Sequence, residues 1–173
     1  MKKNLILLGM MAVGKTTLGK IVAKKQELEF IDTDINIEKK NSMTIKEIFI
    51  KKGEKFFRTE EEKEVLKSLK KNNCVIAVGG GAFINNTLRK NILNNAISIW
   101  LDVDIKILSK RTKWNQKRPL LKKENNQQKL KELYAERKNI YKIANHKITC
   151  DNLSKENIAK KIIALHEKYK NYR

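Results

Sequence analysis

The fold of this chain is decided by one stretch, "NLILLGMMAVGKTT" (residues 4–17). Residues 4–9 form an apolar run that ends at a glycine, which is typical of a buried strand in a parallel sheet. Residues 9–16, "GMMAVGKT", fit the pattern G-x-x-x-x-G-K-[ST], and a helical pattern follows them. A strand before and a helix after are the context that a phosphate-binding loop requires, so we favour that interpretation over a chance glycine turn.

A loop of this kind binds a nucleoside triphosphate largely through its main chain. Successive N–H groups and the helix N-terminus surround the phosphates. The Lys15 ammonium reaches the terminal phosphates, and the Thr16 hydroxyl is a ligand of Mg²⁺. We therefore predict that ATP is bound by residues of the loop and the helix start: Gly9, Met11, Ala12, Val13, Gly14, Lys15, Thr16 and Thr17.

Strand and helix patterns alternate along the rest of the chain. We expect strands at 4–9, 28–34, 74–80, 96–102 and 146–150. We expect helices at 15–26, from Thr44 until Gly53 stops it, at 54–71, around 87–93, from 105 to 111, at 126–143 and after Ser154. Alternation of this kind predicts an α/β fold of three layers, αβα, with a five-stranded parallel sheet in a single domain, 1–173.

Composition limits the class of protein. No apolar run approaches the roughly 20 residues that span a bilayer, and no cleavage site follows the apolar start, so we expect a cytoplasmic chain without membrane contact. The net charge of +20 comes mostly from evenly spread lysine, which favours solvated helix faces over a nucleic-acid surface. Cys74 and Cys150 lie in apolar runs and are expected to be buried and reduced. We expect a monomer.

Acidic residues follow the second predicted strand in "DTD" (32–34). A helix N-cap with a solvated acid is a common explanation of such a pattern. The functional alternative is that Asp32 faces the Mg²⁺ shell while Asp34 orients the hydroxyl that accepts the phosphate. Both acids would lie at the carboxyl edge of the sheet, where parallel sheets bind ligands.

Arginine is rare in this chain, with six residues among 39 basic ones, so each arginine raises a functional question. Arg58 lies three residues before Glu61, and we favour it as a clamp on a substrate anion over a surface ion pair. Arg118 precedes the only proline in a loop at 112–124, which we expect to act as a lid over ATP. Arg137, on a helix, is as well explained as a solvated cation. Arg89 and Arg173 look incidental.

Three glycines in a row, Gly79, Gly80 and Gly81, follow the third predicted strand. One glycine would suffice for a strand-to-helix turn. A run of three predicts that some group comes so close to the main chain that a side chain is excluded.

These elements, in this order and spacing, resemble the shikimate kinase family within the nucleoside-monophosphate-kinase-like P-loop group. The resemblance extends over nearly the whole chain. It rests on Gly9–Thr17, Asp32-Thr33-Asp34, Phe57-Arg58 with Glu61, Gly79–Gly81, Arg118-Pro119-Leu120, and Leu133, Arg137 and Tyr141.

The resemblance implies a role for each element. The chain would transfer phosphate from Mg·ATP to the 3-hydroxyl of shikimate by direct in-line transfer, with Lys15, Asp34 and Arg118 catalytic. Asp34 would bind ring hydroxyls, Arg58 and Arg137 the carboxylate, and Gly79–Gly81 would let the ring lie against the backbone. Arg111 would stack on adenine, Arg118 would contact the transferring phosphoryl group, and Thr16 and Asp32 would hold the metal. The substrate-binding segment would be about 33–61.

One residue departs from the family pattern. Members of the family usually carry glycine where this chain has Ala12, and we expect Ala12 to adopt an ordinary backbone conformation. Three alternatives stay open from sequence. They are a gluconate kinase, a nucleoside-monophosphate kinase on the same scaffold, and a non-catalytic P-loop module that binds nucleic acid through its lysines.

Overall fold

A computed structural model describes residues 4–113 and 126–171 of the chain. Five parallel strands form one sheet in the order β2-β3-β1-β4-β5. The strands are β1 (Asn4–Leu8), β2 (Glu29–Asp32), β3 (Cys74–Ala77), β4 (Ala96–Asp102) and β5 (His146–Thr149). All residues of β1 and β3 are buried, as expected for central strands covered by helices on both faces. The prediction of a five-stranded parallel α/β fold is confirmed.

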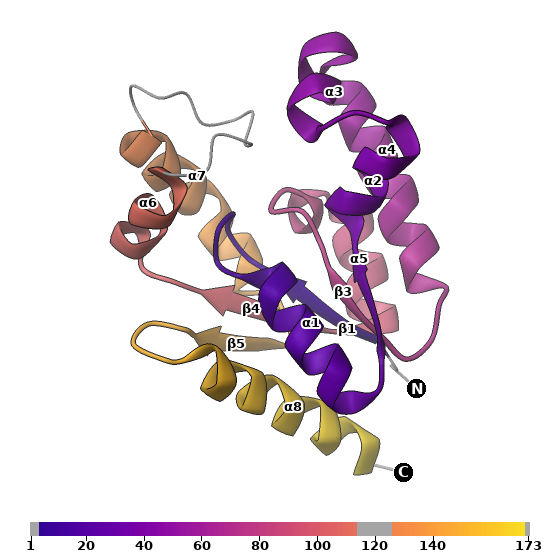
Figure 1. Cartoon of the computed structure of the whole chain (residues 1–173), viewed down its shortest axis with the longest axis vertical. Coiled ribbons are helices and arrows are strands. Elements are labelled where there is room, and N and C mark those ends of the chain that lie inside the picture. Colours follow the sequence, from indigo (N-terminus) through magenta and orange to yellow (C-terminus); the bar gives the residue numbers. More distant parts are fainter. Residues whose placement is uncertain (1–3, 114–125, 172–173) are drawn as a thin grey trace.

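Helices cover both faces of this sheet (Figure 1). Helices α1 (Lys15–Gln26) and α8 (Lys155–Asn171) pack together on one face, and α5 (Asn86–Asn95) packs with α4 (Gly53–Leu69) on the other. The remaining helices are α2 (Thr33–Asn41), α3 (Ile45–Lys51), α6 (Ile105–Lys113), α7 (Asn126–Tyr141) and the short η1 (Ala82–Ile84). In the described part of the chain, no helix has the length and apolar character needed to cross a membrane.

The structure shifts several predicted boundaries by one to three residues, and two of these shifts concern predicted site segments. Strand β2 ends at Asp32, not at residue 34, because the Asp32 side chain accepts hydrogen bonds from the N–H groups of Asp34 and Ile35 and starts helix α2. Helix α6 continues through Thr112 to Lys113, so the predicted lid cannot begin at residue 112. The rest of that predicted lid, including Arg118, lies outside the described residues.

The register between β1 and β3 places the glycine-containing loops that follow these two strands at the same level of the sheet. Strands β1 and β3 are neighbours, and Leu7 pairs with Ala77. Gly9 lies two residues after Leu7 and Gly79 lies two residues after Ala77, both at the carboxyl edge of the sheet. In Figure 1 the loop after β1 lies between two raised parts of the molecule, with α2 and α3 on one side and α6 and α7 on the other. A ligand in this region would contact both loops.

The raised segment from α2 to α4 has a small core of its own. Ile37, Ile45, Ile48 and Phe57 are buried together there, separate from the large core around the sheet. This small core stabilises the segment above the edge of the sheet.

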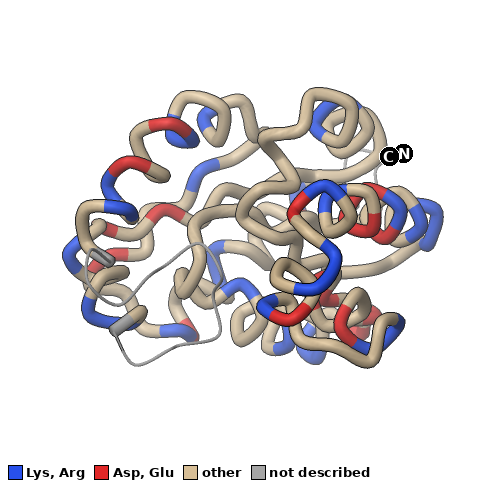
Figure 2. Tube along the Cα trace, turned by 90° about the horizontal axis from the view of Figure 1, so that it is seen from above, with Lys and Arg blue, Asp and Glu red and all other residues tan. Residues whose placement is uncertain are grey.

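Charged residues are spread widely. Figure 2 shows Lys and Arg on many elements around the described molecule, with Asp and Glu interleaved among them. This distribution agrees with the expectation of solvated helix faces for a chain of net charge +20.

Candidate active site

The loop between β1 and α1 has the backbone geometry that its glycines predict. Gly9 and Gly14 adopt φ values of 139° and 101°, which a residue with a side chain rarely adopts. Gly14 is the N-cap of α1 and has no side chain, so the first N–H groups of the helix receive no side-chain cap from this residue. The Lys15 ammonium donates to the carbonyls of Gly9 and Met10 at 2.9 and 3.0 Å, which holds its charge against the loop.

The prediction for Ala12 is wrong. Its φ is 62°, in the left-handed region, although we expected an ordinary conformation. An L-residue pays about 1–2 kcal/mol for this conformation, because its Cβ crowds the neighbouring carbonyl oxygen. The turn between Gly9 and Gly14 imposes the conformation, so the loop keeps the shape of a glycine-containing loop at the cost of local strain.

Thr16 and Asp32 come together at the start of α1 and the end of β2. The Thr16 hydroxyl donates to Asp32 Oδ2 at 2.7 Å. The other carboxylate oxygen of Asp32 caps helix α2. The two interpretations of Asp32, a helix cap and a member of a metal shell, are therefore compatible, because each uses a different oxygen.

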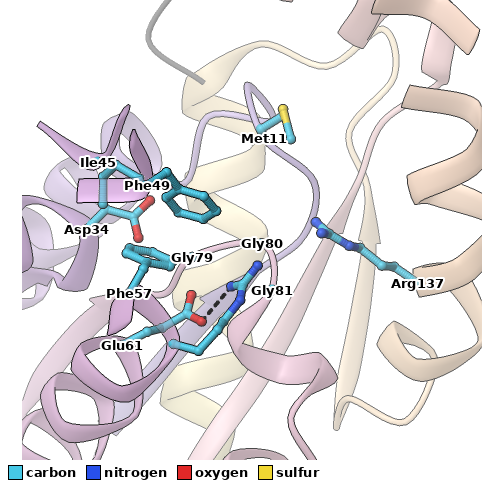
Figure 3. Close-up of a pocket in the computed structure, with 11 residues that line it drawn as sticks. Met11, Asp34, Ile45, Phe49, Phe57, Glu61, Gly79, Gly80, Gly81 and Arg137 are labelled. Carbon is cyan, nitrogen blue, oxygen red and sulfur yellow. Dashed lines mark hydrogen bonds and ion pairs between the residues drawn. The ribbon is translucent and has the colours of Figure 1, made fainter. Parts of the chain in front are cut away.

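A first pocket lies at the phosphate loop and is lined by Met11, Ala12, Gly14, Lys15, Thr16, Thr17 and Thr112. A second pocket lies beside it. The residues that line the second pocket come from the loop after β1, from α2 to α4, from the triple glycine and from α7. They are Met11, Asp34, Ile45, Phe49, Phe57, Arg58, Glu61, Gly79, Gly80, Gly81 and Arg137. Figure 3 shows Asp34, Phe57 and Glu61 approaching the glycines from one side and Arg137 from the other. The residues that the sequence suggested for the acceptor thus surround a common cavity.

Arg58 is held by two carboxylates on its own helix. It donates to Glu61 at 2.7 Å and to Glu54 at 3.0 Å. Burial works to lower the pKa of Arg58, but Glu61 and Glu54 outweigh burial and raise it. Burial raises the pKa of Glu61 and Asp34 adds to this effect, whereas Arg58 opposes it. The guanidinium is consequently a fixed, permanent cation at the wall of the pocket.

The triple glycine is needed for space and not for backbone conformation. A Cβ on Gly79 would lie 2.5 Å from Glu61 Oε1 and 2.8 Å from Asp34 Oδ1. A Cβ on Gly81 would clash with the Arg58 guanidinium, and one on Gly80 would lie 3.1 Å from Arg137 Nη1. Polar side chains of the pocket itself approach the main chain of the triple glycine. The sequence predicted a close approach of some group, but it did not reveal that these side chains make it.

Arg137 faces the pocket from helix α7 and is only 7% exposed, so the interpretation as a solvated surface cation is wrong. Leu130, Leu133 and Tyr141 lie on the same buried face of the helix. This spacing of three and four residues brings the guanidinium to the glycine loop.

Arg111 and Arg89 also differ in their surroundings. Arg111 is exposed at the end of α6 and its Nη1 lies 3.4 Å from the Ala12 carbonyl, beside the phosphate loop. Arg89, which looked incidental, donates to the carbonyls of Phe83 and Ile84 and thus closes the turn that follows the triple glycine.

Sequence reasoning missed several pocket residues. Met11 was assigned to ATP alone, yet it lines both the pocket at the phosphate loop and the neighbouring one. Ile45 and Phe49 add an apolar wall. Nothing in their sequence context distinguishes them from ordinary core residues of an amphipathic helix, so only the fold could identify them.

The two cysteines, Cys74 and Cys150, are buried and free, as predicted.

Comparison with proteins of known structure extends the fold assignment. A gluconokinase of Sinorhizobium meliloti superposes with a TM-score of 0.65 at 11% identity, covering 97% of this chain and 93% of its own. At this identity the likeness concerns the fold alone.

Closer matches converge on one family. The family model described as shikimate kinase matches residues 11–167. A shikimate kinase of Sulfurihydrogenibium is 39% identical over 93% of this chain and 96% of its own length. The shikimate kinase of Acinetobacter baumannii, solved in complex with shikimate, superposes with a TM-score of 0.93 at 34% identity, covering 98% of this chain and 95% of its own. The resemblance inferred from the motifs is confirmed, and the chain belongs to the shikimate kinase family of phosphate-transferring enzymes.

Proposed function

We propose that the two adjoining pockets bind ATP and shikimate, and that the chain transfers the terminal phosphate of ATP to the 3-hydroxyl of shikimate. The observation that carries this assignment is the cavity that joins Asp34, Arg58, Arg137 and the triple glycine next to the phosphate loop. A small ring with a carboxylate and several hydroxyls matches this set of two guanidinium groups, one acid and exposed main chain.

On the acceptor side, Arg58 and Arg137 bind the carboxylate from two elements that face each other across the pocket. Bidentate pairing of guanidinium with carboxylate fixes orientation as well as charge. Asp34 accepts a hydrogen bond from the 3-hydroxyl and is placed to take its proton. Phe49 and Phe57 exclude water from one wall of the pocket.

On the nucleotide side, main-chain N–H groups of residues 9–17 surround the phosphates, and Lys15 leaves its carbonyl partners to reach the terminal phosphate. Arg111 lies beside the adenine, and Arg118, outside the described residues, contacts the transferred group. Met11 lines both pockets, so the two substrates meet across it.

Thr16 and Asp32 would hold Mg²⁺. Their oxygens are 2.7 Å apart and are hard donors, which suits this ion. Mg²⁺ commonly uses only one or two protein ligands and takes the rest from phosphates and water, so a small donor set is sufficient. The bound ion would neutralise charge that develops on the phosphates.

Phosphoryl transfer requires positioning and charge stabilisation more than covalent chemistry from the protein. The geometry supports this account, because Arg58, Glu61 and the glycines line the acceptor side, while Lys15 supplies charge from the start of α1, beside the neighbouring loop. We infer a direct in-line transfer without a phosphorylated enzyme.

The test is acceptor-dependent release of ADP from Mg·ATP. Shikimate, gluconate and AMP are supplied in separate reactions at equal concentration. We expect shikimate to stimulate ADP release strongly and the other two to leave it at the background rate. Stimulation by gluconate or AMP with none by shikimate would overturn the proposal. Salt-sensitive binding to nucleic acid without any acceptor effect would favour the non-catalytic alternative.

A further inference from the structure

Tyr141, the last residue of α7, is fully buried at the base of the acceptor pocket. It does not line the pocket itself. Its hydroxyl nevertheless contacts two residues that line the pocket, Gly80 of the triple glycine and Arg137. A polar side chain in such a position must satisfy its hydroxyl within the protein, because water is excluded there.

The Tyr141 hydroxyl donates a hydrogen bond to the carbonyl oxygen of Gly80. That carbonyl belongs to the peptide between Gly80 and Gly81. Because a peptide is planar and trans, fixing its oxygen toward α7 points the Gly81 N–H away from α7. A glycine run has no side chains to restrict its dihedral angles, so this single bond removes much of its freedom.

The same hydroxyl is coupled to Arg137, which lies four residues earlier on the same buried face of α7. Burial raises the pKa of Tyr141, and the charge and hydrogen bond of Arg137 offset part of that effect. A Cβ on Gly80 would lie 3.1 Å from Arg137 Nη1 and 3.6 Å from the Tyr141 hydroxyl, so the three groups meet at one point.

The ring of Tyr141 is itself held in place. It packs against Trp100 of β4 with a centroid separation of 5.9 Å, and the Lys147 ammonium lies 4.7 Å from the Trp100 ring centroid. Trp100 is only 1% exposed. The hydroxyl is thus presented from a rigid support in the sheet.

We propose that Tyr141 is a positioning residue for the acceptor. Through one hydroxyl it fixes the Gly80–Gly81 peptide and the guanidinium of Arg137, and so sets two walls of the shikimate pocket at once. This inference rests on the proposed function, because it assigns Tyr141 to the binding of the acceptor and not of the nucleotide.

The experiment compares Tyr141→Phe with Tyr134→Phe. Both substitutions delete one phenolic hydroxyl from α7, but the Tyr134 hydroxyl donates to Asp102, away from the acceptor pocket residues. Calorimetric titration with shikimate, and steady-state kinetics, are performed on both variants and on the wild-type enzyme. We expect Tyr141→Phe to weaken shikimate binding and raise its KM about tenfold, as expected for loss of a hydrogen bond to charged and main-chain groups.

The KM for ATP should stay within about twofold, kcat should change less than the shikimate KM, and Tyr134→Phe should bind shikimate as the wild type does. In an Arg137→Ala background, Tyr141→Phe should have a clearly smaller effect, because part of it acts through the guanidinium. Equal loss of shikimate and ATP binding, an unchanged shikimate affinity, or the same effect in both backgrounds would overturn the inference alone. A wild-type enzyme that binds no shikimate would overturn the proposed function, and the inference with it.

Discussion

The loops after β1 and β3 lie side by side, and both are rich in glycine, yet they need glycine for different reasons. In the first, Gly9 and Gly14 have positive φ and serve the backbone conformation, and a Cβ on Gly9 would also meet rigid main chain, the Leu101 carbonyl oxygen. In the second, a Cβ on Gly79 or Gly81 would collide with the ends of polar side chains, so glycine serves space. The first loop takes its shape from its own main chain, while the second is shaped by the residues that pack onto it.

This difference teaches that a glycine in a sequence has two distinct consequences when it is replaced. Where conformation requires it, replacement strains the fold. Where space requires it, replacement moves the neighbouring side chains, and the effect appears in ligand binding. The two loops of this enzyme allow both cases to be measured within one protein.

The largest expected effect comes from the charge of the first loop. Lys15→Met removes the ammonium that would meet the terminal phosphate, and kcat should fall about 10³-fold, in the range found for loss of one preorganised charge contact. Shikimate affinity should be nearly unchanged. The matched control is Lys20→Met, an exposed lysine on the same helix, which should keep the wild-type rate. A Lys15→Met enzyme of near normal kcat would remove Lys15 from the mechanism.

The next effect is on stability. Gly9→Ala would place a Cβ 2.5 Å from the Leu101 carbonyl oxygen at a φ of 139°. Because the neighbour is main chain of β4, it cannot move aside, and the free energy of unfolding should fall by about 3 kcal/mol. Denaturant titration measures this. An unfolding midpoint equal to that of the wild type would show that neither the backbone conformation nor the contact with β4 main chain requires glycine in this loop.

Gly79→Ala should affect substrate binding and leave the stability of the fold nearly unchanged, in contrast to Gly9→Ala. The clash is with the ends of Glu61 and Asp34, which can shift, so stability should change little. The displaced carboxylate should raise the KM for shikimate about 100-fold, as a displacement of about 1 Å commonly does. Kinetics and thermal melting of the same preparation separate the two effects. A large loss of stability with an intact KM would break the comparison between the loops.

The smallest expected effect concerns Ala12. Ala12→Gly relieves the left-handed conformation at φ 62° but adds chain entropy to the unfolded state, so the net gain should be about 0.5–1 kcal/mol. Ala135→Gly is the control, since the same substitution at an exposed position of α7 should destabilise by about 1 kcal/mol. If both substitutions destabilise equally, Ala12 is not strained in solution.

Much of this fold could be predicted because its patterns are local. The bounds of α1 and β4 agree with the predicted 15–26 and 96–102, since each is bordered by clear signals in the sequence. Helix α2 was missed as an element. Its nine residues are mostly polar, and its start depends on the cap that Asp32 provides after β2. Short helices of this kind owe their stability to tertiary contacts more than to their own sequence.

Site residues could be predicted where their chemistry requires a residue type that is rare in this chain, such as arginine. They could not be predicted where their role depends only on how distant segments pack together. Arg58 and Glu61 could be paired by spacing, and their ion pair is present at 2.7 Å. The burial of Arg137 could not be inferred, because its helix has polar residues on most sides. The contacts of the glycines with Asp34 and Arg58 join segments far apart in sequence, and no local pattern records them.

The central claim is that Arg58 and Arg137 together bind the carboxylate of the acceptor. Calorimetric titration of Arg58→Ala and Arg137→Ala with shikimate, and separately with Mg·ATP, tests it most directly. The account predicts shikimate binding about 100-fold weaker in each variant, because truncation of one partner of a buried charge pair costs several kcal/mol, with ATP binding changed less than about threefold. Equal losses for the two ligands, or undiminished shikimate binding, would contradict the account.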